Sequence, residues 1–355
     1  MKQIIDKLIY KDERFQDYNN AIGNKNILIT GLNPSAKAMM LAESYMHHQK
    51  QMVVVTSNLY QAERLERDLV QLVNEEDVFK FPVQDIMIEE FSTKSPDLMQ
   101  ERIRTLTHLA KGQNGLFLIP VNGLEKLISQ KETFLKYHLE ITLGIDIDLV
   151  ELQQRLIDMG YQKTERVTTL GEFSVRGGLI DIYPMIGEPV RIELFDTEVD
   201  SIRAFDIDSQ RSLHNIDKVE LSTASEFIFS AEDLKLMSDN LSEAFENTRT
   251  KIKTNVRDDL RETYETVKLN MTELFSHNIL RRMVKFAYRE ETTIADYLKE
   301  DAIIVIDEYN RVIEAKDAAI RENSEFMESL IESGRGFIGQ TFIKEGSLEA
   351  LTNKH

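Results

Sequence analysis

The chain has no cysteine among its 355 residues. This absence excludes disulfide bonds, thiolate catalysis, and zinc or iron–sulfur sites with cysteine ligands, and it fits a reducing cytosol. Seven histidines are present, including the pair His47 and His48, but none has the HxxxH or HExxH spacing of a metal site. The sequence therefore predicts no bound metal.

Basic charge and long apolar runs are also scarce. Lys and Arg number 43 against 61 Asp and Glu, and the net charge of -18 argues against a large nucleic-acid surface. No run approaches the ~20 apolar residues that cross a bilayer, and the charged N-terminal segment lacks the apolar core of a secretory signal. We therefore expect a cytoplasmic protein with no membrane partner.

The first third of the chain alternates apolar strands with amphipathic helices. Strands are expected at residues 26–30, 52–56 and 115–120, and helices at residues 36–47, 61–73 and 97–110. This order predicts a parallel sheet with helices on both faces.

The pattern changes near residue 140. A short helix capped by Asp148 and ended by Gly160 leads into short strands with period-two alternation, which predict an antiparallel region. A polar helical stretch follows, and the α/β type resumes with an apolar strand at 302–306 and a helix at 312–331. The predicted fold is a discontinuous parallel-sheet α/β domain (1–140 and 224–355) with an inserted, mainly antiparallel α+β domain (141–223).

Arginine and aromatic side chains alternate with aliphatic ones in the inserted region. If the aliphatic faces of its strands point inward, Arg176, Tyr183, Arg191 and Phe195 point outward. These residue types often carry the binding energy between proteins, so the sequence predicts a contact surface. The alternative is that the aromatic residues cap a small core and that each arginine pairs with a nearby carboxylate.

A degenerate phosphate loop follows the first expected strand. Gly31 and Lys37 keep the spacing of GxxxxGK[ST], but Ala36 replaces the second glycine and Ala38 replaces the hydroxyl that binds magnesium. Lys37 alone could attract an anion, yet we expect no productive nucleotide hydrolysis at this loop.

An acidic pair, Asp307 and Glu308, follows the strand expected at 302–306. Its position resembles the acidic motif that holds magnesium in nucleotide hydrolases. Two interpretations remain open, the remains of a nucleotide site and an ordinary pair of carboxylates at a strand end.

Four segments carry a resemblance to a known family. They are GEFSVRGGLIDIYP (171–184), the run VRIELFDTEVDSIRAFDIDSQRSL (190–213), LIPVNGLEKL (118–127) and VIDEYNR (305–311). Together they resemble the N-terminal module of the bacterial transcription-repair coupling factor (Mfd) family, which is itself similar to UvrB, the damage-recognition component of the excision nuclease. The resemblance covers the chain from about residue 5 onward.

The resemblance implies a degenerate P-loop NTPase-like fold whose inserted domain binds UvrA, another component of the excision nuclease. The family's contact residues match Arg166, Arg176 and an aromatic residue that is either Tyr183 or Phe173. We expect Arg191, Glu193 and Phe195 to add supporting or rim contacts. The implied function is that of an adaptor that recruits UvrA to RNA polymerase stalled at DNA lesions, for transcription-coupled nucleotide excision repair.

Catalysis is expected to belong to parts of the family that lie outside this chain. Full-length members are ATP-dependent DNA translocases, with ATP and magnesium in the motor and with RNA polymerase and duplex DNA as further partners. The segment 81–96 is short and acidic and has no tyrosine, unlike the DNA-clamping hairpin of UvrB. We expect no enzyme activity and no cofactor here.

Two alternative functions remain open. One is a weak nucleotide hydrolase that uses Lys37, Asp307 and Glu308, and the other is direct DNA binding by the inserted domain.

Overall fold

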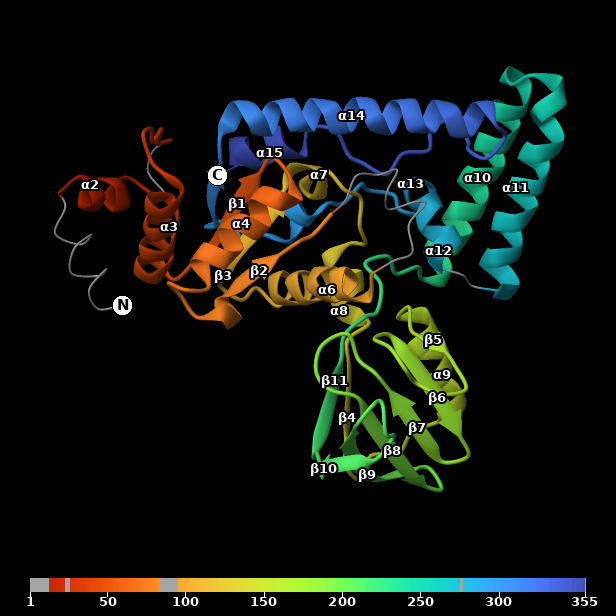
Figure 1. Cartoon of the computed structure of the whole chain (residues 1–355). Coiled ribbons are helices and arrows are strands. Elements are labelled where there is room, and N and C mark those ends of the chain that lie inside the picture. The colour runs from red at the N-terminus through yellow and green to blue at the C-terminus, as the bar shows by residue number, and fades with distance from the viewer. Residues whose placement is uncertain (1–12, 23–25, 84–94, 275–276, 355) are drawn as a thin grey trace.

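The computed structural model describes residues 13–22, 26–83, 95–274 and 277–354. Figure 1 shows three parts: an α/β body, a mainly antiparallel domain beneath it, and a helical arm at one side. The long helix α14 (Tyr309–Glu332) runs from the body to the arm. Within the described residues, no helix combines the length and the apolarity that crossing a membrane would require.

The body is built on a four-stranded parallel sheet in the order β12-β1-β3-β2. Its strands are β1 (Gln51–Thr56), β2 (Val78–Lys80), β3 (Gly115–Pro120) and β12 (Ile303–Ile306). β1 and β3 are buried along their whole length, as expected for parallel strands covered on both faces. The late strand β12 pairs with β1 from Met52↔Ile303 to Val55↔Ile306. The predicted mixed α/β class with a parallel sheet is confirmed.

Helices cover both faces of this sheet because successive strand residues point to opposite sides. Val54 and Leu118 pack on one side with α3 (Pro34–His48) and α4 (Leu59–Leu69). Val53 and Phe117 pack on the other side with α6 (Pro96–Ala110) and α14. The smaller helical elements of the body are α2 (Glu13–Ala21), η1 (Glu75–Asp77), α7 (Val121–Leu124), α8 (Lys131–Lys136), η5 (Ile294–Tyr297) and α15 (Ser347–Lys354).

The strand expected at residues 26–30 is absent, so that prediction is wrong. These residues have no regular structure, and Leu28 is 86% exposed. β-branched and aliphatic residues favour a strand only where a neighbouring strand and a packed face receive them. Here the pairing of β1 is taken by β12 and β3. The helix expected at 61–73 also ends earlier, at Leu69.

The second part of the molecule is a six-stranded sheet in the order β10-β9-β8-β7-β6-β5. Its strands are β5 (Gln162–Lys163), β6 (Glu172–Arg176), β7 (Leu179–Ile182), β8 (Val190–Phe195), β9 (Glu198–Phe205) and β10 (Ser212–Asn215). All neighbours are antiparallel except β5 and β6. A separate antiparallel pair joins β4 (Leu139–Thr142) to β11 (Lys218–Leu221). This confirms the predicted antiparallel region.

One apolar cluster fills this part. The helix α9 (Leu149–Asp158) contributes Leu152 and Leu156, which pack with sheet residues such as Ile180 and Ile192. Asp148 Oδ1 accepts hydrogen bonds from the backbone N–H groups at the start of α9, as its cap position predicts. Gly160 follows the helix with a φ of +92°.

The helical arm has a core of its own. α10 (Ala231–Lys251) and α11 (Arg257–Leu269) pack through Leu241 and Leu260, and the pair Ser230 and Asp233 closes a capping box at the start of α10. The remaining elements of the arm are η2 (Thr254–Val256), η3 (Asn270–Leu274), α12 (His277–Leu280), η4 (Arg281–Met283) and α13 (Val284–Ala287).

A buried ionic cluster attaches the antiparallel part to the body. Glu226, in the segment that leaves this part, is fully buried and lies 2.9 Å from Arg102 Nε and 2.8 Å from Lys126 Nζ. Met185 of the antiparallel part packs into the core of the body. Glu125, next to Lys126, accepts hydrogen bonds from the backbone of Ser347 and Leu348 at the start of α15. The segment 118–127 is therefore a structural junction.

Candidate partner-binding face

The outward face of the antiparallel sheet carries rows of polar side chains set by strand register. Ser174, Asp181, Arg191 and Arg203 stand opposite one another across β6, β7, β8 and β9. Arg176, Leu179, Glu193 and Ser201 form the next row. We call this surface, together with Arg166 and Tyr183, the arginine face.

Asp181 is the central residue of the arginine face. Its side chain is 1% exposed, and its carboxylate accepts hydrogen bonds from Arg176 Nη2 at 2.7 Å and from Arg191 Nε and Nη2 at 2.7 and 2.9 Å. A buried carboxylate needs such partners, because removing a charge from water is costly. The hydrogen bonds to Asp181 also raise the pKa of the Arg191 guanidinium.

Arg191 is held inside the structure. Beyond its two bonds to Asp181, its Nη1 donates to the backbone oxygen of Gln210 at 3.1 Å, and its guanidinium lies 4.9 Å from the ring centre of Phe205. The side chain is only 15% exposed. Arg191 therefore lies on the outward face, as the alternation predicts, but cross-strand partners cover it. The alternative that each arginine pairs with a nearby carboxylate holds for Arg176 and Arg191 with Asp181, and for Arg203 with Glu193 at 2.6 Å.

Arg176 differs, because its side chain is 52% exposed while its guanidinium pairs with Asp181. It precedes a tight turn that needs both glycines. Gly177 has a φ of +61°, and a Cβ on Gly178 would lie 2.9 Å from the backbone oxygen of Leu194. The turn itself lies beside the end of β8, because the Leu194 N–H donates to the Gly178 oxygen at 2.8 Å; Phe195, the last residue of β8, is 77% exposed.

Arg166 lies in an irregular loop after β5. It is exposed, and its Nη2 donates to the backbone oxygen of Asp208 at 3.1 Å. The loop is fixed to β6, since Ser174 Oγ donates to the backbone oxygen of Glu165 at 3.0 Å. Arg166 therefore borders the same face as Arg176.

Tyr183 is half-buried at the other end of the hairpin. Its backbone N–H donates to Glu172 at 2.9 Å, and its position two residues after Asp181 places it on the same face. Glu172 is four residues before Arg176, so the face extends about 13 Å along the strands from Tyr183 to Arg176 at about 3.3 Å per residue.

Phe173 lies on the opposite face of the sheet and is fully buried in the core. It pairs with Ile182, and both side chains point inward. The expectation that Phe173 contacts a partner is therefore wrong. The sequence already indicated this, because Phe173 and Arg176 are three residues apart on one strand, and such residues point to opposite faces of the sheet.

The degenerate phosphate loop is an ordinary helix start. Asn33 caps α3 and accepts a hydrogen bond from the Ala36 N–H at 2.8 Å, so this amide is not available to an anion. Ala38 is buried in the core beneath the helix. Gly31, with a φ of +81°, precedes the cap.

Lys37 and the acidic pair come together, as the nucleotide-site interpretation required. Lys37 Nζ forms an ion pair with Asp307 and lies 3.9 Å from Glu308, which has a left-handed φ of +59°. The lysine charge is thus balanced by protein carboxylates, while Arg311 lies 2.6 Å from Glu308. An ion pair thus joins the start of α3 to the acidic residues that follow β12.

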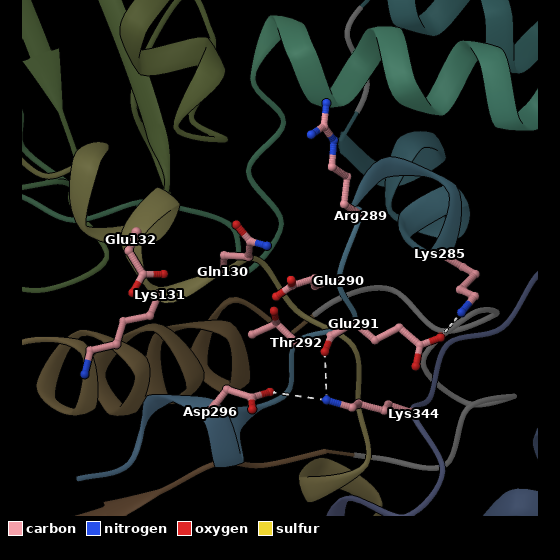
Figure 2. Close-up of a pocket in the computed structure, with 10 residues that line it drawn as sticks. All are labelled: Gln130, Lys131, Glu132, Lys285, Arg289, Glu290, Glu291, Thr292, Asp296 and Lys344. Carbon is pink, nitrogen blue, oxygen red and sulfur yellow. Dashed lines mark hydrogen bonds and ion pairs between the residues drawn. The ribbon is translucent and has the colours of Figure 1, made fainter. Parts of the chain in front are cut away.

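A pocket of about 860 Å³ lies between the body and the arm and was not anticipated from any motif. Figure 2 shows its ten lining residues, with Lys344 close to both Asp296 and Glu291. Lys344 Nζ lies 3.7 Å from Asp296 and donates to the backbone oxygen of Glu291 at 2.8 Å, and Lys285 also pairs with Glu291. Four basic and four acidic side chains line the pocket, so its lining charges balance and favour neither an anionic nor a cationic ligand. Among the described residues, no group of three His, Cys, Asp or Glu is placed to hold a metal.

Comparison with known proteins matches both the inserted region and the whole chain. Residues 139–227 match the UvrB interaction domain. The chain is 50% identical over all 355 residues to the transcription-repair-coupling factor of Staphylococcus epidermidis and covers 30% of that protein. It is 51% identical over 348 residues, 98% of the chain, to the same factor of Staphylococcus aureus, again 30% of the relative.

A third relative is the transcription-repair-coupling factor of Staphylococcus haemolyticus, 50% identical over 351 residues, which are 99% of the chain and 30% of the relative. The chain thus spans about a third of the length of these curated relatives. The resemblance inferred from its motifs is confirmed: the chain is a homologue of the N-terminal region of the transcription-repair-coupling factors and contains a UvrB interaction domain.

Proposed function

We propose that this chain is an adaptor module whose arginine face binds UvrA and recruits it to RNA polymerase stalled at DNA lesions. The observation that carries the proposal is the half-exposed guanidinium of Arg176, held on buried Asp181 within a region that matches the UvrB interaction domain. The process would be transcription-coupled nucleotide excision repair in the cytoplasm.

The chemistry of the face supports a protein partner with carboxylates. Asp181 engages one terminal nitrogen of Arg176, which leaves the rest of that planar fork for a second carboxylate. Arg166 and Tyr183 border the same face, and Phe195 adds exposed apolar area at the end of β8. Anchors of these types each contribute ~2 kcal/mol or more to typical interfaces.

The α/β body serves, in this proposal, as a scaffold without catalysis or cofactor. The support is the Lys37–Asp307 ion pair and the capped amide of Ala36, which together occupy the groups that a phosphate would need. ATP and magnesium, RNA polymerase and duplex DNA would be bound by other parts of the full-length protein. The division into body (1–140 and 224–355) and inserted domain (141–223), with a degenerate P-loop NTPase-like body, belongs to the same proposal.

The test is a calorimetric titration of the chain with UvrA. Arg176→Ala should weaken binding about 30-fold, which corresponds to ~2 kcal/mol, with only a small decrease in melting temperature, because Arg191 keeps two hydrogen bonds to Asp181. Arg249→Ala is the matched control, because Arg249 is also half-exposed and pairs with one carboxylate, Glu246, but lies on α10 of the arm. Equal affinities of wild type and folded Arg176→Ala would overturn the proposal.

A further inference from the structure

The loop between β9 and β10, residues 206–211, is a compact and strained turn. Asp206 Oδ1 accepts hydrogen bonds from the N–H and the Oγ–H of Ser209 at 2.8 and 2.6 Å, and the backbone oxygen of Asp206 accepts from the Gln210 N–H at 2.7 Å. Gln210 has a φ of +60°, a conformation that side chains with a Cβ seldom adopt. Such strain persists only where surrounding contacts impose it.

Contacts from this loop reach two separate segments of the arginine face. Gln210 Nε2 donates to the backbone oxygen of Val167 at 3.2 Å, next to Arg166, and Arg166 Nη2 donates to Asp208. On the other side, the Gln210 backbone oxygen accepts from Arg191 Nη1, the residue that holds Asp181. The loop therefore joins the segment of Arg166 to the network that orients Arg176.

We propose that Gln210 is a positioning residue of the UvrA-binding face, an inference that rests on the proposed function. Its side-chain amide fixes the Arg166 segment, while its backbone oxygen fixes Arg191. Holding a long arginine side chain in one place before binding reduces the conformational entropy that binding must remove. Gln210 thus sets the separation of Arg166 and Arg176 without touching the partner.

The test uses Gln210→Asn in the full chain. Asparagine tolerates the left-handed backbone, which preserves the turn, but it is one methylene too short to keep the bond from the side-chain amide to the Val167 oxygen. The same amide of Gln210 also donates to the Ile207 oxygen at 2.8 Å, within the loop itself. Affinity for UvrA should fall about fivefold with an unchanged melting temperature, because one side chain loses its order before binding. The control is Gln154→Asn, an exposed glutamine on α9 whose amide donates only to Asp158 of the same helix.

A double-mutant cycle separates positioning from general structural support. Because Gln210 acts through Arg166, the double variant Gln210→Asn/Arg166→Ala should bind no more weakly than Arg166→Ala alone. Additive losses, or an unchanged affinity of Gln210→Asn, would overturn the inference while leaving the Arg176→Ala result, and so the adaptor proposal, intact.

A measurement made without UvrA distinguishes failure of the Gln210 positioning role from failure of the proposed UvrA-binding function. NMR relaxation of the Arg166 Nε–H group should report faster motion in Gln210→Asn than in wild type or Gln154→Asn. Unchanged Arg166 motion would overturn the positioning role whatever the chain does with UvrA. If Arg166 motion changes but wild-type chain fails to bind UvrA, the proposed function is wrong and the contact network described for Gln210 stands.

Discussion

Asp181 and Arg191 face each other on adjacent antiparallel strands and share two hydrogen bonds, of 2.7 and 2.9 Å. Both are largely buried, whereas Arg176, bound to the same carboxylate, is half-exposed. The same buried carboxylate therefore binds one buried arginine and one half-exposed arginine.

Loss of Arg191 is expected to destabilise the fold. Arg191→Ala leaves Asp181 buried with only Arg176 as a cation, and breaking a buried pair in this way costs about 3 kcal/mol of unfolding free energy. Arg203→Ala, which breaks a pair about one-third exposed, should cost less than about 1 kcal/mol. Urea unfolding followed by circular dichroism measures both. Equal losses for the two variants would contradict the structural role of Arg191.

The two phenylalanines of this sheet are expected to behave oppositely. Phe173→Ala opens a cavity in the core and should lower the unfolding free energy by about 3 to 5 kcal/mol. Phe195→Ala removes an exposed ring, so it should change stability by less than about 0.5 kcal/mol. Thermal unfolding and a UvrA titration of Phe195→Ala provide the measurements, and the titration should show weaker binding. A stable Phe173→Ala would refute the burial assigned to that ring.

The Lys37–Asp307 pair predicts that nucleotide does not bind. A titration with Mg-ATP should give no binding heat in the micromolar range, because the lysine charge is already balanced and the Ala36 amide is engaged. Lys37→Met leaves the Asp307 carboxylate, only 11% exposed, without its lysine, so it should lower the unfolding free energy by about 3 kcal/mol. Micromolar binding that disappears in Lys37→Met would restore the hydrolase alternative.

Glu220 provides a pH-dependent contact between β11 and the body. Hydrogen bonds from Lys111 of α6, the larger cause, and from Lys218 lower the pKa of Glu220 from 4.5 to about 2. A depressed pKa in the folded state means that the contact contributes fully above pH 4.5 and is lost as the pH falls from there toward about 2. Acid should therefore loosen this attachment.

Carboxyl-detected NMR titration checks the value for Glu220, with Glu220→Gln identifying the resonance. Lys111→Met should move the midpoint back toward 4.5, because it removes the largest cause of the shift. Lys251→Met on the arm is the control and should leave it unchanged. A wild-type midpoint near 4.5 would show that the Lys111 contact does not form in solution.

Much of the fold follows from local pattern. The helices α3, α6, α9 and α14 and the strands β1, β3 and β12 correspond to expected elements, since their periodicity and caps are properties of contiguous residues. The segment 26–30 has the same apolar composition but no strand. Whether such a segment forms a strand depends on an available pairing partner. The edge of β1 is instead paired with β12, which comes from about 250 residues further along the chain.

The candidate site was only partly predictable for the same reason. Alternation correctly predicted that Arg176 is exposed, and the same alternation places Phe173 on the core side of its strand, against the match to the family motif. No sequence signal marked Gln210, whose role depends on a strained φ and on contacts to two distant segments.

The sequence alone determined that cysteine chemistry is excluded, that the phosphate loop lacks its glycine and hydroxyl, and which local elements form. These are properties of residue type and spacing. Only the tertiary structure decided how exposed each charge is: Lys37 pairs with Asp307, and Arg191 and Arg176 both pair with Asp181, but only Arg176 is half-exposed. The physical reason is that the partners and the burial of a charge depend on strand register and on how distant segments pack together.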